Sequence, residues 1–107
     1  MANIYKNSKV DLTNTNITTL YTAPSATTAS VRSILVSNDS GSDDTITLTI
    51  TNSASTLFSL YKNEEVGALS SKELLSQPLV VMESEILKVT AATAGRLHVV
   101  ASYLEIT

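Results

Sequence analysis

The stretch from Arg96 to Ile106, which ends one residue before the C-terminus, constrains the fold of this 107-residue chain most. It is rich in β-branched and aromatic residues and follows Gly95, a pattern typical of a long strand. Alternation along that strand places Leu97, Val99, Ala101 and Tyr103 on one face, and His98, Val100, Ser102, Leu104 and Ile106 on the other. A strand with water on one side carries polar residues there, whereas this one is largely apolar on both faces. This indicates a β domain in which the protein's own core covers one face and another subunit covers the second.

The rest of the chain reads as further short strands separated by turns of three to seven residues. Expected strands cover residues 17–22, 31–37, 45–51, 56–62, 79–82 and 86–91. The segment 45–51 has the clearest alternation, with three aliphatic residues facing one way and four threonines the other. In 31–37, strict alternation places Val31 and Leu35 on the face opposite to Ile34 and Val36.

Two connections and one ambiguous segment complete this interpretation. Residues 38–44 predict a hairpin loop and residues 63–67 a second exposed connection. Residues 69–77 fit either a one-turn helix, capped by Ser70 with Glu73, or an extended segment. We favour the extended form, because Gln77 precedes Pro78 and that position disfavours helix.

The pattern predicts an all-β fold: a single antiparallel β-sandwich, jelly-roll or immunoglobulin-like, with seven to nine short strands. Residues 1–16 are expected to form an N-terminal extended arm, which becomes a short edge strand or packs on a neighbour. Residues 17–107 form the sandwich domain. No segment is long and helix-periodic enough to make the crossover of an α/β fold.

Composition removes several classes of function. There is no cysteine, so disulfides and thiolate metal sites are excluded. Seven basic residues are spread singly in a chain of net charge −3, which does not provide the basic stripe of a nucleic-acid-binding protein. The first residues lack the apolar run of a signal peptide, and no stretch approaches the length of a membrane span. We therefore expect synthesis in the cytoplasm, and neither nucleic acid nor membrane as a partner.

The surface is expected to be unusual, because charged residues make up only 16% of the chain while 30 of its 107 residues are Ser or Thr. A typical soluble domain has about 25% charged residues. A surface of hydroxyls and methyls suits a protein packed among neighbours. The alternative explanation is that threonine simply favours strands.

No set of residues predicts catalysis, a cofactor or a metal site. His98 is the only histidine and lies within a strand without a nucleophile motif, so we interpret it as a hydrogen-bonded residue on a sheet face or a subunit contact. Asp39, Asp43 and Asp44 surround Gly41 but lack the ligand spacing of a calcium loop, which favours a solvated hairpin tip. The paired Glu83 and Glu85 are expected to face solvent beside an apolar strand.

The sequence also resembles a known family. Residues 20–24 (LYTAP) and 31–38 (VRSILVSN), followed by 78–81 (PLVV), 87–91 (LKVTA) and 97–105 (LHVVASYLE), are similar to small β-sandwich virion structural proteins of tailed bacteriophages. These motifs consist of strand and turn residues and together cover most of residues 17–105. The resemblance implies a non-enzymatic component of the virion, of the capsid decoration or tail accessory type, present in repeated copies.

Combined with the apolar second face of the last strand, this implies a homo-oligomer that docks on other virion proteins as capsid decoration or cement, or as a tail or neck accessory. It would be made in the host cytoplasm and located in the virion. The residues expected at the subunit interface are Ile4, Tyr5, Val100, Leu104 and Ile106.

The alternative is a receptor- or carbohydrate-binding module of a tail fibre or capsid. Its binding site would lie in the exposed loops rather than on strand faces. The candidate residues in those loops are Asp39, Asp43, Asp44, Glu64 and Glu65.

Overall fold

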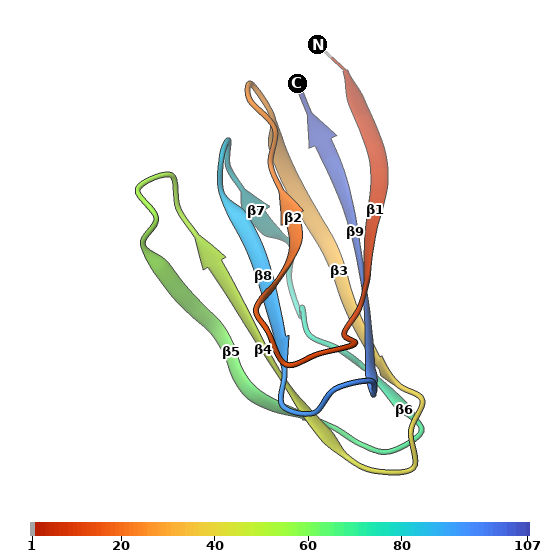
Figure 1. Cartoon of the computed structure of the whole chain (residues 1–107). Helices are drawn as coiled ribbons and strands as arrows, with labels where there is room; N and C mark the ends of the chain where they lie inside the picture. The colour runs from red at the N-terminus through yellow and green to blue at the C-terminus, as the bar shows by residue number, and fades with distance from the viewer. Residues whose placement is uncertain (1) are drawn as a thin grey trace.

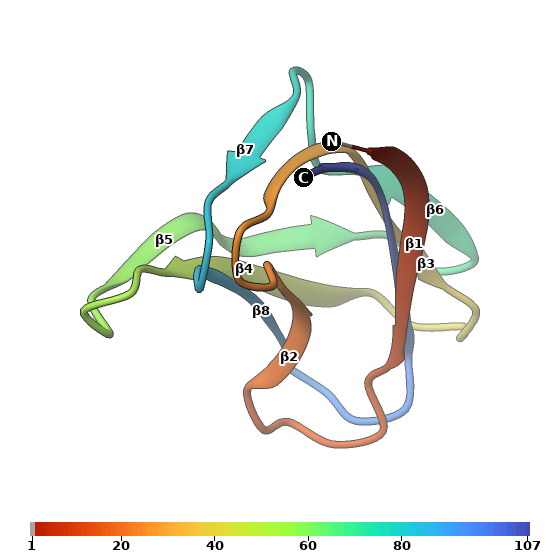
Figure 2. The same cartoon turned by 90° about the horizontal axis from the view of Figure 1, so that it is seen from above.

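The computed structural model describes residues 2–107, which form two antiparallel sheets packed face to face (Figures 1 and 2). The described part of the chain contains nine strands and no helix. No helix within it could therefore cross a membrane. This confirms the all-β sandwich. The strands are β1 (Asn3–Asp11), β2 (Thr18–Thr22), β3 (Thr28–Asn38), β4 (Asp44–Thr51), β5 (Leu57–Val66), β6 (Ser70–Glu73), β7 (Leu79–Val81), β8 (Ile86–Ala91) and β9 (Leu97–Ile106).

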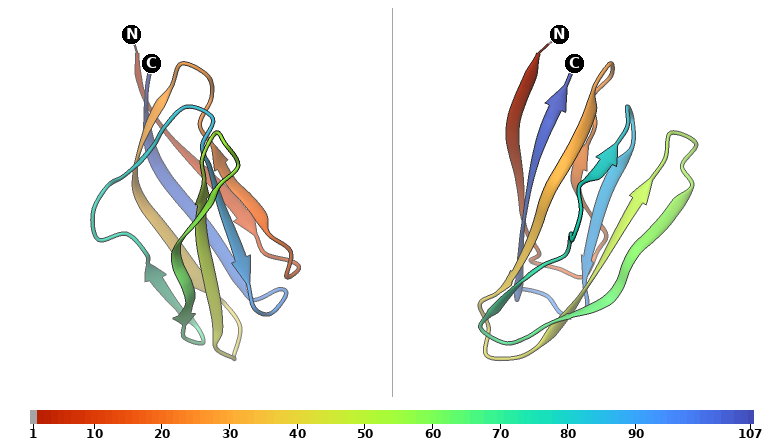
Figure 3. Two further views of the ribbon diagram at one scale, coloured as in Figure 1. Left: turned by 90° about the vertical axis from the view of Figure 1, so that its left-hand side faces the viewer. Right: turned by 180° about the vertical axis from the view of Figure 1, so that it is seen from behind.

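Sheet A contains β1, β9, β3 and β6 in that order, and β7 also pairs with β3. Strands β6 and β7 follow one another along the same edge of β3, as the view from behind shows (Figure 3). Sheet B contains β2, β8, β4 and β5 in that order. The last strand, β9, is therefore central in sheet A, and it pairs with β1 on one side and β3 on the other.

The core is the apolar layer between the sheets. Its twenty buried hydrophobic residues include Ile46 and Leu48 from β4 and Leu87 and Val89 from β8. In β9, the predicted inward set is confirmed, since Leu97, Val99, Ala101 and Tyr103 are all buried. Burying a side chain of this kind contributes about 1.5–3 kcal/mol, so this layer is the main source of stability.

The N-terminal segment lies along β9. Strand β1 pairs with β9 over nine residues, from Asn3 opposite Ile106 to Asp11 opposite His98. After β1, Leu12 is buried, and its backbone N–H donates to the Leu97 carbonyl at 3.0 Å. The chain then passes to sheet B, where Pro24 follows the end of β2 as expected for a residue without a ladder donor.

The alternation predicted for residues 31–37 is wrong. Val31, Ile34 and Val36 are all buried in the core, whereas Leu35 is exposed on the other face. The register between β3 and β9 shifts between Val31 and Ser33, which leaves Arg32 as the extra residue of a β-bulge. Because one inserted residue reverses the phase of a strand, the bulge turns Leu35 outward.

Two further segments, residues 69–77 and residues 63–67, can be compared with their predicted structures. Of residues 69–77, for which we favoured the extended form, Ser70–Glu73 forms β6 and none is helical. The exposed connection predicted over 63–67 is wrong, because β5 continues to Val66. Asn63, the first residue of that predicted connection, takes a φ of 52° at a register shift, a conformation that asparagine tolerates within a bulge.

Candidate functional site

The outer face of sheet A carries several exposed apolar side chains. Register places Tyr5, Leu104, Ser30 and Val80 in one row across four strands. A second row contains Lys9, Val100 and Leu35, and Ile106 lies two residues beyond Leu104. We call the apolar members of this face the outer patch: Tyr5, Leu35, Val80, Val100, Leu104 and Ile106.

Members of the outer patch are well exposed. Tyr5 is 74% exposed and Val80 55%, while Leu35 and Ile106 are 41% and 37% exposed. Val100 and Leu104 are half-buried because their neighbours on β1 and β3 partly cover them. Within residues 2–107 nothing lies over this face, so its apolar side chains are available to a partner.

The outer face of sheet B has a different character. Four threonines of β4 point to this side, of which Thr45 and Thr47 are half-buried and Thr49 and Thr51 are buried. On β8, Lys88 lies opposite Thr49 and Thr90 lies opposite Thr47. The apolar side chains that accompany them are Leu57 and Ile86 at one end. The two outer faces therefore differ in chemistry. A partner that buries apolar area is expected to bind the outer face of sheet A.

Four of the five residues predicted for the subunit interface lie together in the outer patch: Tyr5, Val100, Leu104 and Ile106. Ile4 does not join them, because it alternates with Tyr5 and lies opposite the inward-facing Glu105. Sequence reasoning missed Leu35 and Val80. The bulge hid the outward direction of Leu35, whereas the position of Val80 beside Ser30 depends on strand order.

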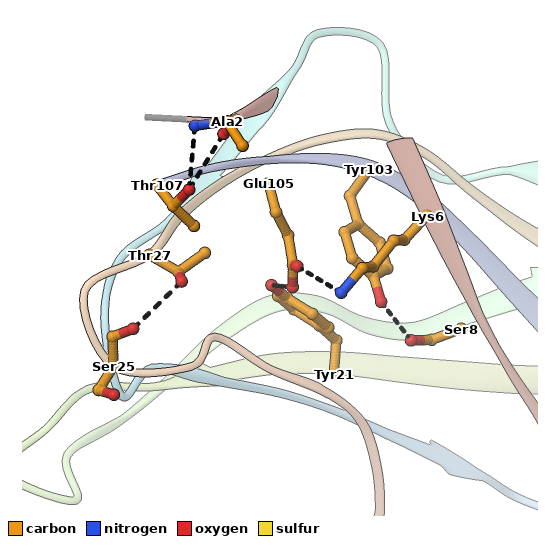
Figure 4. Close-up of polar contacts among 9 residues, drawn as sticks. All are labelled: Ala2, Lys6, Ser8, Tyr21, Ser25, Thr27, Tyr103, Glu105 and Thr107. Atoms are coloured by element: carbon orange, nitrogen blue, oxygen red, sulfur yellow. Dashed lines mark hydrogen bonds and ion pairs between the residues drawn. The ribbon is translucent and has the colours of Figure 1, made fainter. Parts of the chain in front are cut away.

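A polar cluster, buried at Glu105 and Tyr21 but exposed at Lys6, links β1 to β9 and β2 (Figure 4). Glu105 is only 6% exposed, and its Oε1 lies 2.8 Å from Nζ of Lys6 on β1. The Tyr21 hydroxyl donates to Glu105 Oε2 at 2.6 Å, and the ring centroids of Tyr21 and Tyr103 lie 4.1 Å apart. The hydroxyls of Ser8 and Tyr103 share a hydrogen bond of 2.9 Å. Three strands from two sheets are thus joined by side-chain contacts.

The ionisation of this cluster follows from its contacts. The hydrogen bond from Lys6, and to a smaller extent the one from Tyr21, holds the pKa of Glu105 below its usual value. Burial acts in the opposite direction. The same contact with Glu105 raises the pKa of Lys6. Burial, followed by the hydrogen bond to Glu105, raises the pKa of Tyr21.

This cluster predicts a defined loss of stability in acid. Glu105 ionises more readily in the folded than in the unfolded chain, where a glutamate has a pKa of about 4.3. Its contribution to the free energy of unfolding is thus complete above that value, and it is lost as the pH falls through the lower folded pKa. Urea denaturation between pH 7 and pH 3 should show this decline in the wild type and a shallower one in Glu105→Gln. Glu65→Gln, which changes an exposed glutamate, should keep the wild-type slope; equal slopes for all three proteins would refute the prediction.

The two loops predicted as binding loops meet at one end of the sandwich. Asn38 donates from its amide to the Val66 carbonyl at 3.1 Å, and the Ala68 backbone N–H donates to Asp43 at 2.8 Å. Asp44 is only 5% exposed, and its two carboxylate oxygens accept the backbone N–H groups of Thr45 and Thr93. Asp44 therefore shapes the loop rather than presenting a carboxylate to solvent.

The remaining loop carboxylates have different surroundings. Glu64 pairs with Lys72 on β6 and so connects the edges of the two sheets. Asp39 and Glu65 are exposed. Asp39 lies 3.8 Å from Nδ1 of His98, whose Nε2 lies 3.2 Å from Asp11. His98 thus sits between two carboxylates at one end of the outer face of sheet A. No three His, Cys, Asp or Glu side chains within residues 2–107 are placed to hold a metal ion together.

Glu83 and Glu85 also serve the backbone. Glu83 accepts the N–H of Ala26 at 3.0 Å, and Glu85 accepts that of Met82 at 2.8 Å. Both carboxylates therefore stabilise turns at the end of the sandwich opposite the acidic loops, and they do not form a pair directed at a common point.

Comparisons with known proteins show the fold. No family model matches the chain, and no curated protein matches its sequence. Among solved structures, a protein of the disulfide-linked pili that form Bacillus endospore appendages matches with a TM-score of 0.58 and 13% identity, over 98% of this chain and 88% of that one. A chain in the structure of the infectious bursal disease virus Gt strain matches with a TM-score of 0.52 and 16% identity, over 94% of this chain. The match spans 31% of that viral chain.

One neighbour comes from endospore appendages and the other from a virus. The likeness is one of fold, since the identities are low. The present chain has no cysteine, so the disulfide links of the pili have no counterpart here.

Proposed function

We propose that this protein is a non-enzymatic structural component of a tailed-bacteriophage virion, which self-associates and docks on the particle through the outer face of sheet A. The outer patch carries the proposal, because six apolar side chains share one face on which no segment within residues 2–107 packs. The resemblance of the strand and turn motifs to phage virion proteins supplies the kind of particle. The fold shared with an appendage protein and a viral protein supports a structural role.

The size of the face is consistent with a stable contact. Four strand positions at a spacing of about 4.8 Å, and strands of about ten residues at about 3.3 Å each, give a flat area of about 630 Å². Side chains add to that area, and a stable interface needs about 800 Å² from each partner. The outer face of sheet A can therefore supply most of one interface, with the strand edges adding the remainder.

We prefer this function to that of a receptor- or carbohydrate-binding module. The carboxylates of Asp43, Asp44 and Glu64 are engaged by groups of the protein itself. Most carboxylates at the loop end are thus bound by groups of the protein itself, whereas the apolar side chains of the outer patch remain exposed. Capsid decoration or cement, and a tail or neck accessory, are the two placements that suit a small oligomerising sandwich.

Two measurements test the proposal. Size-exclusion chromatography with light scattering should give a mass that is a multiple of 11.4 kDa at high concentration. A reconstruction of the intact particle should then show repeated copies with the outer face of sheet A against a neighbour. A protein that stays monomeric, and whose outer patch faces solvent in the particle, would refute both the interface and the docking role.

A further inference from the structure

A shallow hollow lies between the two apolar rows of the outer face of sheet A. Its floor contains Ser102, a small side chain in a central strand, which lies opposite Asn7 on β1 and Ser33 on β3. Because the rows on either side carry Tyr5 with Leu104 and Val100 with Leu35, the hollow is a polar gap within the outer patch. The residues that line it are Tyr5, Lys6, Asn7, Arg32, Ser102 and Tyr103.

Arg32 is the charged group that this hollow leaves free. It is the extra residue of the bulge in β3, it is exposed, and its side chain makes no hydrogen bond or ion pair with residues 2–107. The other cation at the hollow, Lys6, already binds Glu105 at 2.8 Å. A guanidinium beside an exposed tyrosine is well suited to a carboxylate, which it can bind through two parallel hydrogen bonds.

Arg and Tyr are also the residues that most often dominate protein interfaces. In the hollow they stand on either side of a small residue, within an apolar surface. This arrangement fits an acidic side chain of a protein partner, because the flanking apolar rows would exclude water from the ion pair.

The chain itself offers such carboxylates at its other end. Asp39 and Glu65 are exposed, and they are brought to one end of the sandwich by the bond between Asn38 and Val66. We call these two residues the acidic loop end. Arg32 precedes Asn38 by six residues of strand, a distance of about 20 Å, so the acidic loop end is unable to reach the hollow of its own chain.

We propose that the hollow at Arg32 binds the acidic loop end of a second copy, so that copies associate head to tail. This inference rests on the proposed function, since it specifies how copies meet at the outer face of sheet A. The charges are complementary, because the hollow carries a free guanidinium and the acidic loop end carries exposed carboxylates. Because the two surfaces differ, the contact is heterologous and generates a ring or an open chain rather than a closed dimer.

Charge reversal tests the pairing. Arg32→Glu alone, and Asp39→Lys combined with Glu65→Lys, should each raise the dissociation constant of self-association at least about tenfold, since each places like charges together. Mixing the two variants should restore association, because each reversed surface then meets an opposite charge. Analytical ultracentrifugation of each variant and of the mixture measures this. Circular dichroism should show unchanged folding, because all three side chains are exposed.

The outcomes separate this inference from the proposed function. If the reversed variants assemble as well as the wild type, or if their mixture does not associate, the pairing of Arg32 with the acidic loop end is wrong. If Leu104→Asp still dissociates the assembly in that case, the outer patch remains the interface with a different geometry. A monomeric wild type overturns both.

Discussion

Leu104→Asp is expected to dissociate the assembled protein into monomers at concentrations where the wild type is oligomeric. Leu104 lies at the centre of the outer patch, between Tyr5 on β1 and Ser30 on β3. An aspartate there would bring a charge into the apolar part of an interface, where an unpaired buried charge is strongly unfavourable. The folded monomer should tolerate the change, because Leu104 is only half-buried and points away from the core. Light scattering coupled to size exclusion measures the loss of mass.

Thr47→Asp provides the matched control for this prediction. Thr47 is also half-buried and lies on a central strand, but on the outer face of sheet B. It should leave the mass of the assembly unchanged. If both variants dissociate the assembly equally, the asymmetry between the two outer faces does not determine association. If Leu104→Asp assembles normally, the outer patch is not the interface.

Leu48→Ala should cause the largest loss of stability of the substitutions considered. Leu48 is fully buried in β4, opposite Tyr61 of β5 and Val89 of β8. Truncation of a buried leucine costs about 2–5 kcal/mol, because it removes apolar contacts and leaves a cavity. A domain of this size has a free energy of unfolding of about 5–15 kcal/mol, so the variant is expected to lose a large share of it. Urea denaturation followed by circular dichroism gives the difference.

Leu57→Ala removes the same atoms from an exposed position and serves as the comparison. Leu57 is 48% exposed at the start of β5, so its truncation should cost less than about 1 kcal/mol. Equal losses for the two variants would mean that the layer between the sheets does not provide the main stabilisation.

Local patterns in the sequence were enough to predict the fold class. Alternation in residues 45–51 and 97–103 gave the inward faces of β4 and β9, because a side chain's face depends on the parity of its position in a regular strand. Pro24 and the polar segment 38–44 indicated where the neighbouring strands end. The sequence was misleading at Arg32 and Asn63, where bulges interrupt parity and a turn residue lies within a strand.

The candidate site was only partly accessible to sequence reasoning. The sequence groups Val100, Leu104 and Ile106, because they share one face of one strand. It predicts Tyr5 at the interface only because the N-terminal arm is expected to pack on a neighbour. Leu35 and Val80 come from other strands, so their place beside β9 depends on pairing across long sequence separations. The same holds for Glu105, whose ion pair with Lys6 joins residues at the two ends of the chain.

The sequence by itself determined that this chain forms an antiparallel β-sandwich whose last strand is apolar on both faces, because period-two patterning is a local property. Tertiary structure alone decided that β9 is the central strand of sheet A, that Tyr5 of β1 faces outward beside Leu104 of β9, and that Arg32 stands free beside a hollow. These features depend on strand order, on register and on a single bulge. All three are set by the packing of the whole chain, which no local window contains.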